Sequence, residues 1–303
     1  MVYTRLGKAV LLLPVLIYTA FSAGPFVWTA MMSLRTTDEI YRSHYGLPIP
    51  AHWGKFYTAW TEFGYSTYFR NSAIVAGTAV ILITLVGAMA GYGFARKRFA
   101  FPLREPLFLM LFLSVMFPPQ IMILSLFQIL IKYKLFNTLP GVILVYVSTE
   151  LPITIYLLRA FFAQIPQELE EAARIDGCTD WSMFWRVMFP MARPAVATTF
   201  ILNFIYFWNE FLYAVIFITR QEIRTLPLAI QFLVSDQYQD IGMLATGLII
   251  ASLPVLLMYL FLSEWFVKGM GRRTDQALRP AQDRRGPFVS SRHAMAGRIR
   301  RCF

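Results

Sequence analysis

The chain has 303 residues, of which 57% are hydrophobic and only 15% are charged. A soluble globular domain is closer to half apolar and a quarter charged, so this composition excludes an ordinary soluble domain and predicts a membrane protein. The net charge is +11, but ten Lys or Arg and only two Asp or Glu lie from Val267 onward. Because the basic character belongs mainly to that one segment, we expect no nucleic-acid partner.

Six apolar segments are long enough to cross the roughly 30 Å hydrocarbon core of a bilayer as helices. A backbone in lipid must satisfy its polar groups within the segment, so we predict an all-α membrane protein with six transmembrane helices. The first segment follows two basic residues, as a signal peptide does, but its length favours an uncleaved span. The six segments are residues 9–34, 71–94, 107–131, 139–162, 196–218 and 241–266.

The loop after the second span gives the orientation, because short loops rich in Lys and Arg remain in the cytoplasm. It contains Arg96, Lys97, Arg98 and Arg104. With six spans, both termini are then cytoplasmic. We expect a six-span transmembrane domain over residues 1–271 and a basic, disordered cytoplasmic tail over residues 272–303.

Polar residues interrupt the third and fourth spans. Pro118-Pro119-Gln120 breaks the third, and a broken helix at membrane depth is tolerated only where protein or water surrounds it. Gln120 therefore either lines a pathway or gate, or marks an ordinary proline kink. Glu150 lies in the fourth span, where a charge costs about 2.5–3.5 kcal/mol and normally faces the bundle interior or water. It either lines a pathway or makes a structural hydrogen bond to a neighbouring helix.

A short helical hairpin, at about residues 165–195, separates the fourth span from the fifth. Acidic residues fill its first turns, where the helix dipole favours anions. Gly177 stands where a glycine ends a helix, and Thr179 can cap the next helix. The second helix places Trp181, Phe184, Trp185 and Met188 on a single apolar face.

Two interpretations of this hairpin remain open on its physics alone. It could lie on the lipid headgroups through its aromatic face. Alternatively, it could be a rigid docking element that enters a groove on a soluble partner. The acidic cluster favours docking, because anionic lipids repel glutamate.

The fifth span carries polar residues near its middle, namely Asn203, Asn209 and Glu210. Amides beside aromatic rings suit the hydroxyl groups and faces of sugars. They equally suit hydrogen bonds between helices, which are routine in membrane proteins.

The hairpin sequence resembles the EAA motif in permease subunits of ABC importers. Glu171-Ala172-Ala173 matches the start of the motif, Asp176-Gly177 matches its glycine, and Phe189-Pro190 stands where Leu-Pro is usual. The strings RNSAIVAG, GYGFARKRF, IPQELEEAARIDG and FWNEFL resemble the carbohydrate-uptake branch of that family, and especially the second permease of maltose and glycerol-phosphate importers. The resemblance covers roughly residues 5–270.

This resemblance implies the type I ABC importer permease fold, in which the hairpin is a coupling helix seated in a cleft of a cytoplasmic ATPase. Glu171 would contact a basic residue of the ATPase, and Gly177 would form the turn that orients the hairpin. The coupling residues would be Glu170, Glu171, Ala172, Ala173, Asp176, Gly177, Phe184 and Pro190. The candidates for lining the pathway are Gln120, Glu150, Asn203, Asn209 and Glu210.

We therefore predict a permease subunit that moves a sugar or sugar-like solute into a bacterial cell across the cytoplasmic (inner) membrane. Its expected partners are a second permease subunit, a cytoplasmic ABC ATPase dimer, an extracytoplasmic solute-binding protein and the lipid bilayer. The chain contains no G-x-x-x-x-G-K-[ST] phosphate loop, so ATP is used by a separate subunit. We expect no catalytic residue, metal site or cofactor here, and the chain is not predicted to be an enzyme.

Two alternatives stay open. One is a proton-coupled secondary transporter that uses Glu150 or Glu210 as its proton site. The lack of an internal repeat and the specific hairpin argue against it. The other is a membrane scaffold that transports nothing and whose hairpin only recruits a soluble protein.

Overall fold

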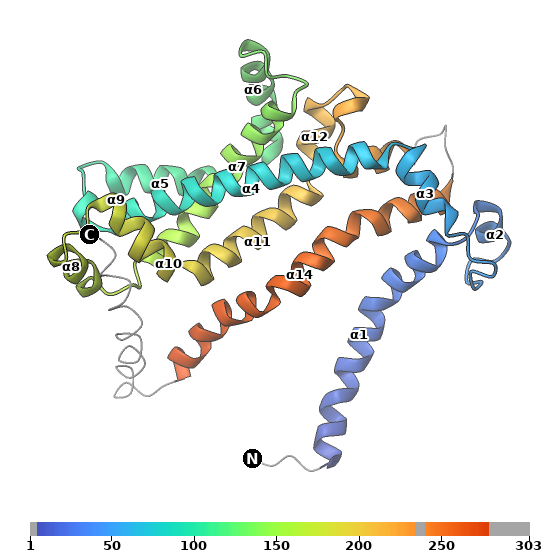
Figure 1. Ribbon diagram of the computed structural model, residues 1–303, viewed down its shortest axis with the longest axis horizontal. Helices are drawn as coiled ribbons and strands as arrows, with labels where there is room; N and C mark the ends of the chain where they lie inside the picture. The colour runs from blue at the N-terminus through green and yellow to red at the C-terminus, as the bar shows by residue number, and fades with distance from the viewer. Residues whose placement is uncertain (1–4, 234–239, 279–303) are drawn as a thin grey trace. The chain divides into compact units, whose positions relative to one another are not determined.

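The computed structural model describes residues 5–233 and 240–278, and every regular element within these ranges is a helix. The chain divides into two compact units, which we describe separately. The first comprises Met1–Asn71 and Glu222–Leu256, and the second comprises Ser72–Gln221 and Leu257–Phe303. The long helices α4 and α14 contribute residues to both units (Figure 1).

Four helices are long and apolar enough to cross a bilayer, and they match the predicted first, second, fourth and sixth spans. Two pairs of helices meet the same test only when taken together, each with a sharp bend, which brings the total to as many as six. The four single spans lie in α1 (Arg5–Ser33), α4 (Tyr65–Ala95), α7 (Leu139–Phe162) and α14 (Ile241–Leu278). Helix α14 continues past the predicted boundary at residue 271, and residues 279–303 of the predicted tail lie outside the described ranges.

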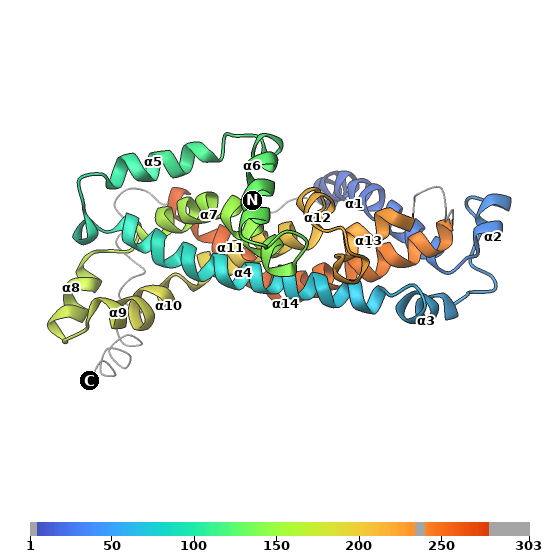
Figure 2. The ribbon, with the colours of Figure 1, turned by 90° about the horizontal axis from the view of Figure 1, so that it is seen from above.

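The predicted interruption of the third span is confirmed, and it is a right-angled turn rather than a mild kink. Helices α5 (Arg104–Ser114) and α6 (Pro119–Lys132) meet at 104°; Figure 2 shows the sharp turn between them. Pro118 has extended backbone angles, and Pro119 begins α6, where its missing N–H is no loss. Gln120 is exposed in the first turn of α6.

The prediction of one continuous fifth span over residues 196–218 is wrong at its centre. Helix α11 (Arg193–Asn209) ends at Asn209, Glu210 adopts an extended backbone, and α12 (Leu212–Phe217) begins two residues later. The Glu210 carboxylate accepts hydrogen bonds from the backbone N–H groups of Tyr213 at 2.7 Å and Ala214 at 3.2 Å. The side chain thus satisfies donors that the broken helix leaves without partners.

In the first unit, the end of α1 packs beside the start of α14. Thr246 donates a hydrogen bond to the carbonyl oxygen of Ser33 at 3.1 Å, and Met32 and Ala245 share a small apolar cluster. The unit also contains α2 (Thr37–Arg42), α3 (Gly54–Thr61) and α13 (Leu226–Leu233). A reciprocal pair of hydrogen bonds between Thr36 and Glu39 caps α2.

In the second unit, α7 is the central helix and packs against α5, α11 and α12. It also contacts α4 closely, at the end of α4 that leads to the basic loop. A Cβ atom added at Gly91 of α4 would lie only 3.0 Å from the backbone nitrogen of Arg159 and 3.0 Å from the Cβ of Leu158. Glycine therefore sets the distance between these two helices.

We expect Gly91→Val to loosen the packing of α4 on α7. The added side chain must push against a backbone atom, and overpacking of this kind costs about 1–3 kcal/mol. The measurement is the melting temperature of the purified membrane complex. Gly93→Val is the matched control, because a Cβ at Gly93 meets no atom within 4 Å. Equal melting temperatures for the two variants would contradict the close-packing role of Gly91.

Candidate functional site

The hairpin forms as a pair of short helices joined by the predicted glycine turn. Its first helix is α8 (Glu168–Ile175), and α9 (Asp180–Met183) begins its second part. Gly177 has φ = +82°, the left-handed conformation expected of a glycine just past a helix end. Thr179 caps α9 by accepting a hydrogen bond from the backbone N–H of Ser182 at 3.3 Å. Both predicted turn residues are therefore confirmed.

The second part of the hairpin departs from the predicted single apolar face. A π-helical turn over Phe184–Met188 follows α9, and α10 (Phe189–Met191) completes it. The backbone N–H of Phe189 bonds to the carbonyl oxygen of Phe184, five residues back. A π turn holds an extra residue and shifts the helical register. Phe184 and Met188 are buried, whereas Trp181, which precedes the π turn, is 62% exposed.

One face of the hairpin is anchored in the core of the second unit. Ala173, Met183 and Phe184 are buried in one cluster with Tyr92 of α4 and Phe162 of α7. The rings of Tyr92 and Phe184 have centroids 5.6 Å apart. Figure 1 shows α8 to α10 beside the end of α4. The hairpin is therefore fixed to the ends of two spans.

The opposite face of the hairpin is exposed and combines a carboxylate with apolar side chains. Glu171 and Ala172 are exposed on α8, and the Glu171 carboxylate accepts a hydrogen bond from the Gln167 side chain at 3.1 Å. Ile175 is 87% exposed at the end of α8, near the exposed Trp181 in sequence. Glu171 and Ile175 are four residues apart on α8, so their exposed side chains lie on the same side of the helix. We call the three exposed residues of α8, Glu171, Ala172 and Ile175, the outer face.

The structure divides the predicted coupling residues between the two faces. Ala173 and Phe184 are buried in the apolar cluster, and Glu170 is buried separately. Asp176 and Pro190 are half-buried, and the exposed members are Glu171, Ala172 and Gly177. The sequence analysis did not identify Ile175 as a candidate. Its place two residues after Ala173 in a helix puts it on the opposite side, which would have indicated an exposed position.

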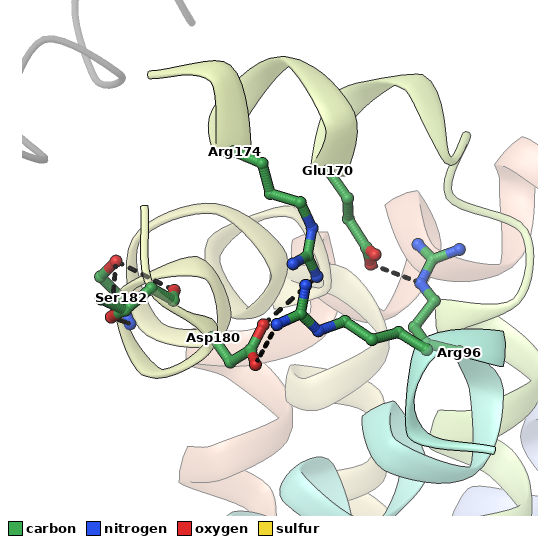
Figure 3. A network of polar contacts seen from close by, with 7 residues as sticks. Arg96, Glu170, Arg174, Asp180 and Ser182 are labelled. Atoms are coloured by element: carbon green, nitrogen blue, oxygen red, sulfur yellow. Dashed lines mark hydrogen bonds and ion pairs between the residues drawn. The ribbon is translucent and has the colours of Figure 1, made fainter. Parts of the chain in front are cut away.

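Ion pairs join the hairpin to the basic loop that follows α4 (Figure 3). The Arg96 Nε atom lies 2.6 Å from Oε1 of Glu170, and both side chains are less than 10% exposed. Arg98 and Arg174 both contact the Asp180 carboxylate, at 2.9 Å and 3.2 Å, in a more exposed setting. Sequence reasoning used Arg96 and Arg98 only to orient the chain. Their opposite charge to the acidic hairpin, on the same side of the membrane, was the signal for these contacts.

Burial raises the pKa of the Glu170 carboxyl, and the positive charge of Arg96 opposes this rise. The charge of each group therefore offsets the cost of burying the other. Removal of either group alone would leave a buried charge without a partner, which is strongly destabilising.

The predicted pathway residues lie in different environments. Asn203 is buried and donates hydrogen bonds to Thr154 of α7 at 3.1 Å and to the carbonyl of Thr199 at 3.0 Å. Glu210 is also buried, and Tyr146 of α7 donates a hydrogen bond to it at 2.5 Å. By contrast, Asn209 and Gln120 are exposed, and Glu150 is half-buried.

Within residues 5–233 and 240–278, no cluster of three or more His, Cys, Asp or Glu side chains is arranged to hold a metal ion. The candidate functional site of the described residues has two separate parts. One is a hairpin with an anchored and an exposed face, and the other is a set of polar residues along α6, α7 and α11.

Comparison with known proteins places the chain among transport components. Residues 83–274, more than half of the chain, match the family described as "Binding-protein-dependent transport system inner membrane component". The chain is 40% identical over 237 residues to the diacetylchitobiose uptake system permease protein NgcG of Streptomyces coelicolor, covering 78% of each chain. It is 35% identical over 255 residues to the probable ABC transporter permease protein YurM of Bacillus subtilis, covering 84% of each.

A solved structure shares the fold. It is a chain of a bacterial ABC transporter involved in import of the acidic polysaccharide alginate, with a TM-score of 0.74 at 18% identity. The match covers 88% of this chain and 99% of the other. The predicted all-α membrane fold of a type I importer permease is thus confirmed. The chain belongs to the family of inner-membrane permease components of binding-protein-dependent ABC transport systems.

Proposed function

We propose that this chain is a permease subunit of a bacterial importer for a sugar or sugar-like solute, and that the hairpin couples it to a separate ATPase. The observation that carries the proposal is the two-faced hairpin. Its inner face is packed against the ends of α4 and α7, while Glu171 and Ile175 project from its outer face. Such an element can receive a force from a soluble partner and pass it to the spans.

The proposal includes a full set of partners. A second permease completes the pathway, an ATPase dimer binds the outer face, and an extracytoplasmic binding protein delivers the solute. The chain lies in the bacterial inner membrane with both termini in the cytoplasm. Residues 1–271 form the permease domain, and residues 272–303 form a basic cytoplasmic tail. The names of the relatives, which concern diacetylchitobiose and alginate, support a sugar as the solute class.

Among the pathway candidates, the environments support different roles. The exposed Gln120, Asn209 and half-buried Glu150 are available to line a path between two permeases. The buried Asn203 and Glu210 make hydrogen bonds that join α11 to α7. We assign the first group to the pathway and the second to helix packing.

Glu171→Lys is the first test. Solute-stimulated ATP hydrolysis is measured in liposomes that contain the chain, its second permease, the ATPase and the binding protein. We expect stimulation to fall by about tenfold or more, because a hydrogen bond to a charged group contributes about 1.5–3 kcal/mol. Glu62→Lys makes the same charge change at an exposed site between α3 and α4 and should leave stimulation intact. Full stimulation with Glu171→Lys would overturn the coupling role.

The glycine turn provides a second test. Gly177→Val should impair coupling while the complex still inserts, because a left-handed conformation costs an ordinary residue about 1–2 kcal/mol. Gly177→Asn is the matched variant, since Asn adopts positive φ more readily, and it should retain most of the stimulation. The readout is again solute-stimulated ATP hydrolysis, normalised to the amount of assembled complex. Equal activity of the two variants would show that the backbone conformation of the turn is unimportant.

A third experiment separates the importer from a proton-coupled transporter. Liposomes with the complete complex, but no ATP, are given an imposed pH gradient and labelled solute. We expect no accumulation in the wild type under these conditions. In a parallel sample that contains ATP, uptake should persist in Glu150→Gln. Accumulation driven by the gradient, and lost in Glu150→Gln or Glu210→Gln, would support the secondary transporter instead.

A further inference from the structure

The ion pair between Arg96 and Glu170 is the most buried charged contact among those described between the hairpin and a span. Arg96 is the first residue after α4, and its backbone has already left the helix. Its Nε atom lies 2.6 Å from Glu170, and its Nη1 atom donates a hydrogen bond to the carbonyl oxygen of Ile165 at 3.0 Å. One side chain therefore holds both α8 and the segment that leads into it.

The ion pair between Arg98 of the basic loop and Asp180 of the hairpin is a weaker contact. The side chains of Arg98 and Asp180 are 51% and 39% exposed, and exposed ion pairs contribute little because water screens them. The apolar cluster around Phe184 holds the hairpin to the core, but apolar contacts have no preferred direction. The Arg96–Glu170 ion pair is buried, and it joins Arg96 to one particular side of α8, although Arg96 Nε and Glu170 Oε1 have no hydrogen-bond geometry.

The position of Glu170 on α8 gives this ion pair a consequence. Successive residues of an α-helix point about 100° apart, so Glu170 and Glu171 cannot face the same way. Glu170 is buried against Arg96, and Glu171 is exposed. Fixing Glu170 therefore fixes the rotation of α8 about its own axis, and with it the directions of Glu171 and Ile175 on the outer face.

Stability alone is a poor explanation for the pair. Replacing a buried ion pair by apolar residues of similar size is often neutral or stabilising, whereas removing one partner is strongly destabilising. A buried charge pair at this joint is better explained by the orientation that it imposes.

We infer that Arg96 is a positioning residue of the coupling machinery, which sets the rotation of α8 through Glu170 and ties the hairpin to the end of α4. This inference rests on the proposed coupling function of the outer face. It assigns Arg96 no contact with the solute or the ATPase. Its role is to transmit a movement of the outer face to α4 without a change in the rotation of α8 about its axis.

The test compares three variants in the reconstituted complex: Arg96→Met, the double variant Arg96→Met/Glu170→Met, and the charge exchange Arg96→Glu/Glu170→Arg. Two quantities are measured, namely the melting temperature and the number of solute molecules transported per ATP hydrolysed. The single variant should melt at a lower temperature, because Glu170 loses its partner. The double Met variant should recover most of the melting temperature, since no unpaired charge remains buried.

The transport ratio separates positioning from stability. We expect the double Met variant to transport about tenfold less solute per ATP, within the range seen for coupled neighbouring residues, despite its recovered stability. The charge exchange should recover part of the ratio, because it restores an ion pair between the same two positions. A wild-type ratio in the double Met variant would overturn the inference and leave the pair with a purely structural role.

Glu171→Lys serves as a separate arm of the same experiment. If Glu171→Lys abolishes stimulation while the double Met variant is normal, the proposed coupling function stands and the role of Arg96 fails. If Glu171→Lys leaves solute-stimulated ATP hydrolysis unchanged, the proposed coupling function itself fails. A normal transport ratio in the double Met variant is then explained by that failure.

Discussion

A bilayer offers no hydrogen bonds, so each polar group that enters it must find its partner within the protein. This constraint explains the long helices, and it also explains where they break. At Glu210 the helix stops and the carboxylate takes over two backbone donors of the next helix. At Pro118 the turn between α5 and α6 uses a residue that has no N–H to satisfy. Each break therefore occurs at a residue that limits the number of unpaired backbone N–H groups: Glu210 accepts hydrogen bonds from two of them, and Pro118 has none of its own.

The same constraint divides what the sequence could predict from what it could not. The four single spans follow from apolar runs of sufficient length, and Gly177 and Thr179 follow from turn and cap chemistry that is local in sequence. The break at Glu210 was missed, because a glutamate in an apolar run does not reveal whether its carboxylate binds a distant side chain or its own backbone. The π-helical turn at Phe184–Met188 was missed for a similar reason. It shifts the register by one residue, and the apolar stripe alone predicts an ordinary helix.

The candidate site shows this limit most clearly in two adjacent glutamates. Glu170 and Glu171 are the same residue type in the same turn, and only the resemblance to the EAA motif assigned Glu171 a contact of its own, while Glu170 was grouped with the coupling residues. Their different environments arise from Arg96, which lies more than seventy residues earlier and reaches Glu170 only after the chain has folded. Conversely, the resemblance to the EAA motif marks the hairpin as a unit and implies a partner contact for Glu171, but it does not show that Glu170, Ala173 and Phe184 are buried.

The hairpin can present an outer face only because its inner face is buried. A helix of eight residues is marginal in water on its own, so the packing of Ala173 and the pairing of Glu170 help to keep α8 helical. The exposure of Glu171 and Ile175 thus depends on the burial of their neighbours. For the same reason, a force applied to the outer face cannot be absorbed by unfolding α8 without breaking those buried contacts. The contacts that keep α8 helical are therefore also the contacts that join it to α4 and α7.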